Sequence, residues 1–265
     1  MSRRISPVLA CLVTSTLLTV LTATPAAAAS DVDYLALGDS YSSGVGAPGQ
    51  TGLCLRSPNG YPAQWAARHD PASFRSVACG GAETGDVRTL QVPYLSSSTD
   101  LVTVTVGGND AGFADTVISC TLGSDAYCAG KVAAARAYIT GTLPGELDRT
   151  YRAIRDRAPN AEVVVLGYPR LFDVSRPGCG IAGMSLAKRR AINAGADDLA
   201  AVTADRAQAA GFTFADVRDE FDGHGACGPG PWINGLVVLP PTDSFHPNRS
   251  GYTSGYLPAL ENTLG

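Results

Sequence analysis

The chain lacks three features that mark common classes of protein. It has no cluster of basic residues, and its formal net charge is −4, which disfavours nucleic-acid binding. Beyond residue 29 it has no apolar run long enough to cross a bilayer. None of its seven cysteines stands at Cys-x-x-Cys spacing, the tight spacing of structural metal sites. We therefore expect no nucleic-acid partner, no transmembrane segment in the mature chain, no metal and no other cofactor.

The first residues have the pattern of a secretory leader. Arg3 and Arg4 make the start positive, Val8–Leu21 is apolar and uncharged, and Ala26–Ala29 supplies the small residues that signal peptidase requires. A membrane-spanning helix is a poorer interpretation, because the apolar stretch is short for a span. We predict that residues 1–29 are a signal peptide and that the mature protein is secreted and extracellular.

Removal of the leader discards Cys11 and leaves six cysteines. An even number in a secreted chain indicates three disulfides. Six cysteines allow fifteen pairings, and the sequence alone does not choose among them. The simplest pairing joins neighbours along the chain, as Cys54–Cys79, Cys120–Cys128 and Cys179–Cys227.

Short apolar segments alternate with helical patterns from residue 30 to residue 265. The predicted strands are Tyr34–Leu37, Phe74–Cys79, Leu101–Val106, Glu162–Gly167 and Thr213–Val217. Most are rich in β-branched residues without strict alternation, which is typical of parallel strands buried on both faces. The predicted helices cover Leu143–Ile154, Leu186–Ala209 and the residues after Pro247. This order predicts a single α/β domain, a three-layer α/β/α sandwich around a parallel sheet of about five strands.

A serine and a histidine have distinctive settings at the two ends of this domain. Gly38-Asp39-Ser40 directly follows the first predicted strand, at the edge where parallel sheets form their sites. Asp243 precedes His246 by three residues. A serine, a histidine that takes its proton and a carboxylate that orients the histidine are the parts of a nucleophilic hydrolase. Taken alone, Gly-Asp-Ser is more often a turn followed by a helix cap.

Two further glycine turns follow predicted strands. Gly81 follows the second strand, where a backbone N–H can donate and a missing side chain leaves room for a substrate. Asn109, in Gly-Gly-Asn-Asp after the third strand, can offer its amide to a developing oxyanion. Each turn alone is more often purely structural. All of these motifs together, each where an α/β sheet forms its site, favour a catalytic interpretation.

In this order the motifs resemble those of the SGNH hydrolases, also called the GDSL esterase/lipase family. Residues 38–40 match its first block, Gly81 its second, residues 107–110 its third and residues 243–246 its fifth. The resemblance covers nearly the whole mature chain and is closest to secreted actinobacterial lipases and esterases. It implies a flavodoxin-like fold, and it supports the disulfide pairing in sequence order.

The resemblance also implies a role for each site residue. Ser40 is the expected nucleophile and His246 the expected base. Asp243 is expected to hold the histidine ring, although some members of the family use a backbone carbonyl for this purpose. The Ser40 N–H, the Gly81 N–H and the Asn109 side chain are expected to form the oxyanion hole.

A different serine-hydrolase fold is disfavoured by the residues around the serine. The α/β-hydrolases carry their nucleophile in Gly-x-Ser-x-Gly, whereas Ser42, not a glycine, stands two residues after Ser40. Those enzymes also place the acid well before the histidine, whereas Asp243 stands only three residues before His246.

We predict a monomeric serine ester hydrolase, a lipase or esterase, that cleaves lipid or aryl esters through an acyl-enzyme on Ser40. Apolar residues of the Gly- and Pro-rich segment Arg218–Pro241, namely Trp232, Ile233 and 236–239, either line an acyl-chain site or pack as core. Aromatic residues make up only 7% of the chain, which weakly disfavours a carbohydrate (acetyl) esterase. The sequence also remains compatible with a phospholipase and, less well, with a catalytically inactive module that binds lipid or glycan.

Overall fold

The computed structural model describes residues 1–2 and 30–265. Residues 3–29 lie outside the described residues. They include Cys11 and all but the first two residues of the predicted signal peptide, 1–29. In the described part of the chain, no helix combines the length and the hydropathy needed to cross a membrane.

Five parallel strands form the central sheet, which confirms the predicted fold class. The strands are β1 Ser30–Gly38, β2 Pro71–Ser76, β3 Leu101–Thr105, β4 Glu162–Leu166 and β5 Thr213–Ala215. Their order across the sheet is β2-β1-β3-β4-β5, so the winding reverses between β1 and β3. Ligands in doubly wound sheets bind at such a reversal.

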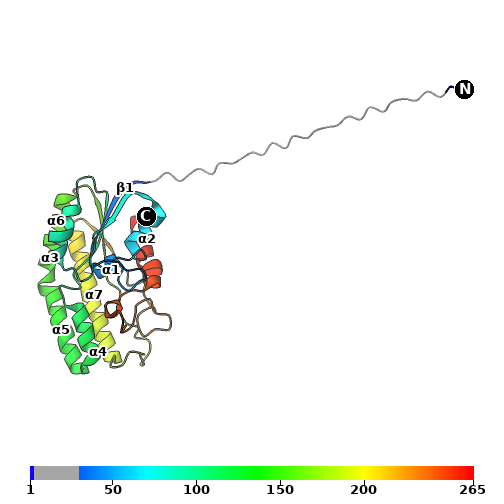
Figure 1. Cartoon of the computed structure of the whole chain (residues 1–265). Helices are drawn as coiled ribbons and strands as arrows, with labels where there is room; N and C mark the ends of the chain where they lie inside the picture. Colours follow the sequence, from blue (N-terminus) through cyan, green and yellow to red (C-terminus); the bar gives the residue numbers. More distant parts are fainter. Residues whose placement is uncertain (3–29) are drawn as a thin grey trace.

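The helices cover both faces of this sheet (Figure 1). On one face lie α4 Phe113–Leu122, α5 Asp125–Gly141, α6 Leu143–Arg157 and α7 Leu186–Ala209, with the short α3 Thr84–Asp86 beside them. On the other lie α2 Tyr61–His69 and α8 Leu257–Leu264. The remaining elements are short, namely α1 Ser40–Ser43, η1 Val87–Gln91, η2 Val92–Tyr94, η3 Pro241–Asp243 and η4 Gly251–Tyr256.

The sequence patterns located every strand and the longest helix. Helix α7 has the predicted bounds Leu186–Ala209, and the C-terminal helix begins as the π-helical turn η4 before it continues as α8. The patterns missed α4 and α5. The buried face of α5 consists of Cys128, Val132, Ala135 and Ile139. Because Cys128 and Ala135 are small, the helical periodicity of large apolar residues is weak in this segment.

Burial follows each strand's place in the sheet. All residues of the inner strand β3 are buried, as are Val163–Leu166 of β4. The edge strand β2 has mainly exposed residues, because only one side of it pairs with a neighbour. The apolar core is therefore centred on the inner strands, between the sheet and the helices that cover it.

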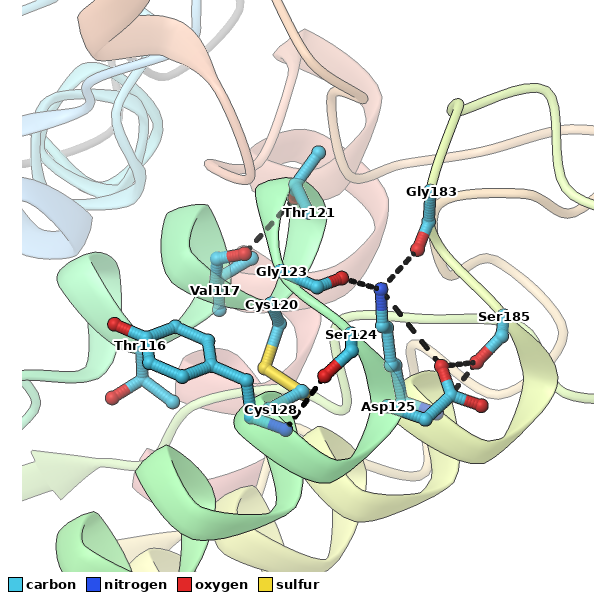
Figure 2. The surroundings of a disulfide bond; sticks show 12 residues. Thr116, Val117, Cys120, Thr121, Gly123, Ser124, Asp125, Cys128, Gly183 and Ser185 are labelled. Carbon is cyan, nitrogen blue, oxygen red and sulfur yellow. Dashed lines mark hydrogen bonds and ion pairs between the residues drawn. A yellow bond between two sulfur atoms is a disulfide. The ribbon is translucent and has the colours of Figure 1, made fainter.

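Three disulfides tie surface segments to this framework, in the pairing that joins neighbouring cysteines. Cys54–Cys79 fixes the loop after α1 to the segment that follows β2. Cys120–Cys128 links α4 to α5 (Figure 2). Cys179–Cys227 links the segment before α7 to the loop after β5.

A buried cation holds the junction of α4, α5 and α7. The side chain of Lys188 is only 4% exposed, and its Nζ donates to the carbonyl oxygens of Gly123 and Gly183 at 2.6 Å each. The carboxylate of Asp125 lies 3.8 Å from the same nitrogen. These acceptors surround the end of α4 beside the Cys120–Cys128 disulfide (Figure 2). Because a buried charge is stable only when it is paired, these acceptors hold Lys188 in place, and Lys188 in turn links the end of α4 to α7.

We expect Lys188→Met to lower the free energy of unfolding by about 2–3 kcal/mol, because two buried carbonyls lose a charged donor. Urea denaturation measures this change. Lys131→Met on the exposed face of α5 is the matched control, with an expected change within about 0.5 kcal/mol. Equal stability of the two variants would contradict this role for Lys188.

Candidate active site

The turn that carries Ser40 is fixed by close packing between β1 and β3. Gly38 ends β1 at φ +118°, and a Cβ on it would lie 2.4 Å from the carbonyl oxygen of Thr105. Asp39 then caps α1, because its carboxylate accepts from the Tyr41 N–H at 2.9 Å. Ser40 is the first residue of that helix, so its own N–H has no acceptor within the helix. The turn therefore presents the hydroxyl and the N–H of Ser40 together.

The structure brings His246 against this serine across most of the sequence. His246 Nε2 lies 2.8 Å from Ser40 Oγ. The other ring nitrogen, Nδ1, lies 3.1 Å from the carbonyl oxygen of Ser244. A ring that donates from Nδ1 to this carbonyl has a lone pair on Nε2, which can accept the serine proton.

The structure does not place the Asp243 carboxylate against the imidazole, where its expected role requires it. Asp243 ends the short helix η3, and its carboxylate accepts from Gln50 Nε2 at 2.8 Å. Phe245 then adopts a left-handed φ of 61°, so the chain does not continue the helical turn that would align residues three apart. The backbone carbonyl of Ser244, not the Asp243 carboxylate, contacts the imidazole.

Burial changes the acid–base property of His246. Desolvation lowers the pKa of the imidazole from 6.5 to about 4, against the opposing effects of the Ser244 carbonyl and the Asp243 charge. The neutral form that accepts a proton from serine is therefore the form present around neutral pH.

The three expected oxyanion donors, Ser40, Gly81 and Asn109, line one cavity together with His246. Gly81 adopts φ +82°, and a Cβ there would meet no atom within 4 Å, so the backbone at this point is open to a ligand. Asn109 Nδ2 donates to the carbonyl oxygen of Ala82 at 3.0 Å. Because an amide NH₂ carries two hydrogens, the second remains available to a substrate oxygen.

Buried hydrogen bonds connect the turn of Ser40 to the turn of Asn109. The Tyr168 hydroxyl donates to the Asp39 carboxylate and accepts from the Gly108 N–H at 3.1 Å. Burial raises the pKa of Asp39 to about 7, although the hydrogen bond from Tyr168 opposes this change. The Gln91 side chain makes two hydrogen bonds to the backbone of Gly38. Its Oε1 accepts from the Gly38 N–H at 2.7 Å, and its Nε2 donates to the Gly38 carbonyl at 2.9 Å.

The sequence analysis missed these supporting residues. Tyr168 stands two residues beyond β4, so the strand-end rule that located Asn109 could have located it too. Gln91 lies within a π-helical turn and had no local signal, because its partner Gly38 is 53 residues away.

An apolar cavity of about 350 Å³ extends from Ser40 and His246. We call it the acyl pocket. Its apolar lining includes Phe113, Val117, Ile118, Leu171 and Phe245. Helix α4, which the disulfide and Lys188 hold in place, thus supplies one wall of the site.

The segment Arg218–Pro241 was expected either to line an acyl-chain site or to pack as core. The structure does not support the first of these interpretations. Ile233 is fully buried, and Trp232 stacks on His224 with ring centroids 3.7 Å apart. Neither residue, nor residues 236–239, lines the acyl pocket. Leu236, Val238 and Leu239 are exposed instead. The acyl-wall interpretation of this segment is therefore wrong, and Pro241 at its end is its only part that lines the pocket.

Comparison with known proteins identifies the chain's relatives. The model of the GDSL-like Lipase/Acylhydrolase family matches residues 36–253. The chain is 52% identical over 233 residues to a lipase from Streptomyces rimosus, an alignment that covers 87% of this chain and 86% of the relative.

Two solved structures share the whole architecture. The extracellular lipase from Streptomyces rimosus superposes with a TM-score of 0.85 at 50% identity, covering 88% of this chain and 99% of that one. The phospholipase A1 from Streptomyces albidoflavus NA297 superposes with a TM-score of 0.84 at 47% identity, covering 87% and 98%.

We expect the imidazole of His246 to titrate near pH 4 in the folded protein. Proton NMR of its Cε1–H measures the midpoint, with His246→Gln to assign the signal. Because the unfolded chain binds this proton below about pH 6.5, His246 also lowers folding stability as the pH falls from about 6.5 towards 4. A midpoint near 6.5 would show that the ring is not desolvated.

Proposed function

The chain belongs to the GDSL-like lipase/acylhydrolase family, and from this premise we propose that it cleaves lipid esters through an acyl-enzyme on Ser40. Membership of the family makes it a carboxylic ester hydrolase. The proposal concerns which residues perform the reaction and which esters react. The observation that carries it is the 2.8 Å approach of His246 Nε2 to Ser40 Oγ at the wall of the acyl pocket.

In the acylation step, Ser40 Oγ attacks the ester carbonyl carbon while His246 Nε2 takes the hydroxyl proton. The carbonyl π electrons move to oxygen and form a tetrahedral oxyanion. His246 then gives its proton to the leaving alcohol as the carbon–oxygen bond breaks. The low pKa of the imidazole makes the imidazolium a strong acid for this second transfer.

The oxyanion is stabilised by donors that are in place before the reaction. The N–H groups of Ser40 and Gly81 and the free N–H of Asn109 surround the position that the charged oxygen occupies. Each such donor contributes about 3–4 kcal/mol to barrier lowering. Their geometry is held by the Tyr168 and Gln91 hydrogen bonds, so little reorganisation accompanies the reaction.

Deacylation repeats the same steps with water. His246 removes a proton from water as the water oxygen attacks the acyl carbon. His246 then returns that proton to Ser40 Oγ as the acid leaves. The Ser244 carbonyl holds the ring tautomer throughout, which makes the site a Ser–His dyad supported by the backbone.

The acyl pocket supports lipid esters as the substrate class. Its walls are largely apolar, so an acyl chain loses contact with water when it enters. The relatives named above are a lipase and a phospholipase A1. An extracellular relative and the three disulfides support secretion.

We expect Ser40→Ala to lower kcat on p-nitrophenyl butyrate by roughly four to six orders of magnitude. A fluorophosphonate probe should label the wild-type protein and not this variant, because only an activated serine reacts readily. Ser98→Ala, an exposed serine outside the site, is the control and should retain both properties. Substantial turnover by Ser40→Ala with an unchanged circular-dichroism spectrum would refute the assignment.

We expect Asp243→Asn to keep kcat/KM within about threefold of wild type, since an asparagine oxygen can still accept from Gln50. Loss of a true triad acid instead costs about 10⁴-fold. Steady-state kinetics on the same ester distinguish the two cases, with Asp222→Asn on the surface as the matched control. A loss near 10⁴-fold would restore Asp243 to the catalytic group.

A further inference from the structure

A second cavity lies next to the acyl pocket and differs from it in character. Its volume is about 530 Å³, and we call it the side pocket. Gly80 and Gly81 line both cavities, so the two meet at the proposed oxyanion hole. The rest of the side pocket includes Arg56, Arg75 and Tyr94, in contrast to the apolar walls of the acyl pocket.

Both arginines of the side pocket lack a carboxylate partner. Among the described residues, no aspartate or glutamate oxygen lies within 4.0 Å of a side-chain nitrogen of Arg56 or Arg75. Asp86 is the acidic residue of this cavity, and its Oδ2 accepts from the Glu83 N–H at 3.0 Å. The cavity is thus lined by two guanidinium groups and one carboxylate, so the positive charges outnumber the negative charge. The carboxylate is already hydrogen-bonded to the backbone.

Each guanidinium is held by a contact that leaves part of its donor set open. Arg56 Nε donates to the Ala78 carbonyl at 2.9 Å, which leaves its terminal nitrogens for other acceptors. The Arg75 guanidinium carbon lies 4.0 Å from the centre of the Tyr94 ring. Stacking uses the face of the guanidinium and leaves its N–H edge in the plane. Planar N–H edges of this kind bind phosphate oxygens in pairs.

We propose that the side pocket binds the phosphodiester of a glycerophospholipid whose scissile ester lies against Ser40. This inference rests on the proposed function and specifies its substrate. The acyl chain of the reacting ester occupies the acyl pocket, and the glycerol carbons pass over Gly81, where a Cβ would meet no atom within 4 Å. The phosphate then enters the side pocket, which Arg56 and Arg75 line.

The arrangement matches the amphipathic structure of such a substrate. An apolar cavity on one side of the oxyanion hole receives the acyl part, and a cationic cavity on the other side receives the charged alcohol part. A neutral ester would fill only the first cavity. The two arginines therefore act on specificity, since they touch the leaving group and not the reacting carbonyl.

The test compares two substrates that differ only in the headgroup. Dihexanoylphosphatidylcholine carries the phosphodiester, and dihexanoylglycerol carries the same acyl chains without it. Arg75→Gln keeps a planar amide that can lie on Tyr94 but removes the charge. The matched control is Arg152→Gln, an exposed arginine of α6 that lines neither cavity.

We expect Arg75→Gln to lower kcat/KM on the phospholipid about tenfold, the effect of losing one charge-assisted contact, and to leave kcat/KM on dihexanoylglycerol within about twofold. Arg75→Lys, which keeps the charge, should recover part of the loss. Arg56→Gln combined with Arg75→Gln should lower the phospholipid rate further. Arg152→Gln should change neither substrate.

Three outcomes overturn the inference. Equal losses on both substrates would make Arg75 a general structural residue, and an unchanged phospholipid rate would remove it from the site. Wild-type protein that cleaves dihexanoylglycerol but not the phospholipid would refute the side pocket alone. Failure on every ester, with no fluorophosphonate labelling, would instead refute the proposed function.

Discussion

The close approach of β1 and β3 at their carboxyl ends is the constraint on which the site depends. The parallel register sets Gly38 beside Thr105, and the Asp39 N–H donates to the Thr105 carbonyl at 2.9 Å. This contact leaves no space for a side chain at residue 38. It also forces the chain to turn sharply there, which presents Ser40 at the point where the winding of the sheet reverses.

Buried polar contacts carry that constraint to the rest of the site. Tyr168 connects the Asp39 turn to Gly108, and Tyr41 donates to the Phe245 carbonyl at 2.9 Å, next to His246. Hydrogen bonds of this kind are costly to leave unmade in a dry interior, so they select one arrangement of Ser40, His246 and Asn109. Two cavities meet beside this centre at Gly80 and Gly81, one with largely apolar walls and one that Arg56 and Arg75 line.

The errors of sequence reasoning occurred where distant segments meet. The three-residue spacing of Asp243 and His246 suggested a shared helical face, but the left-handed Phe245 interrupts the turn between them, and the Asp243 carboxylate accepts from Gln50. The apolar residues of the 218–241 segment suggested either an acyl wall or core packing, yet only Pro241 of that segment lines the acyl pocket, whereas α4 lines it with Val117 and Ile118. A local pattern reports that a residue is apolar or acidic, but it does not report which neighbour the fold supplies.

By itself, the sequence determined the alternation of strands and helices, the turn that carries Ser40 and the residue types that meet at the strand ends. These features depend on local backbone preferences and on the general geometry of parallel sheets. Only the tertiary structure decided that the Ser244 carbonyl contacts His246, that Tyr168 and Gln91 bond to the turns, and that Arg56 and Arg75 line a second cavity. Each of those contacts joins residues whose relation is set by packing, because no short-range rule fixes the direction of a side chain across a folded core.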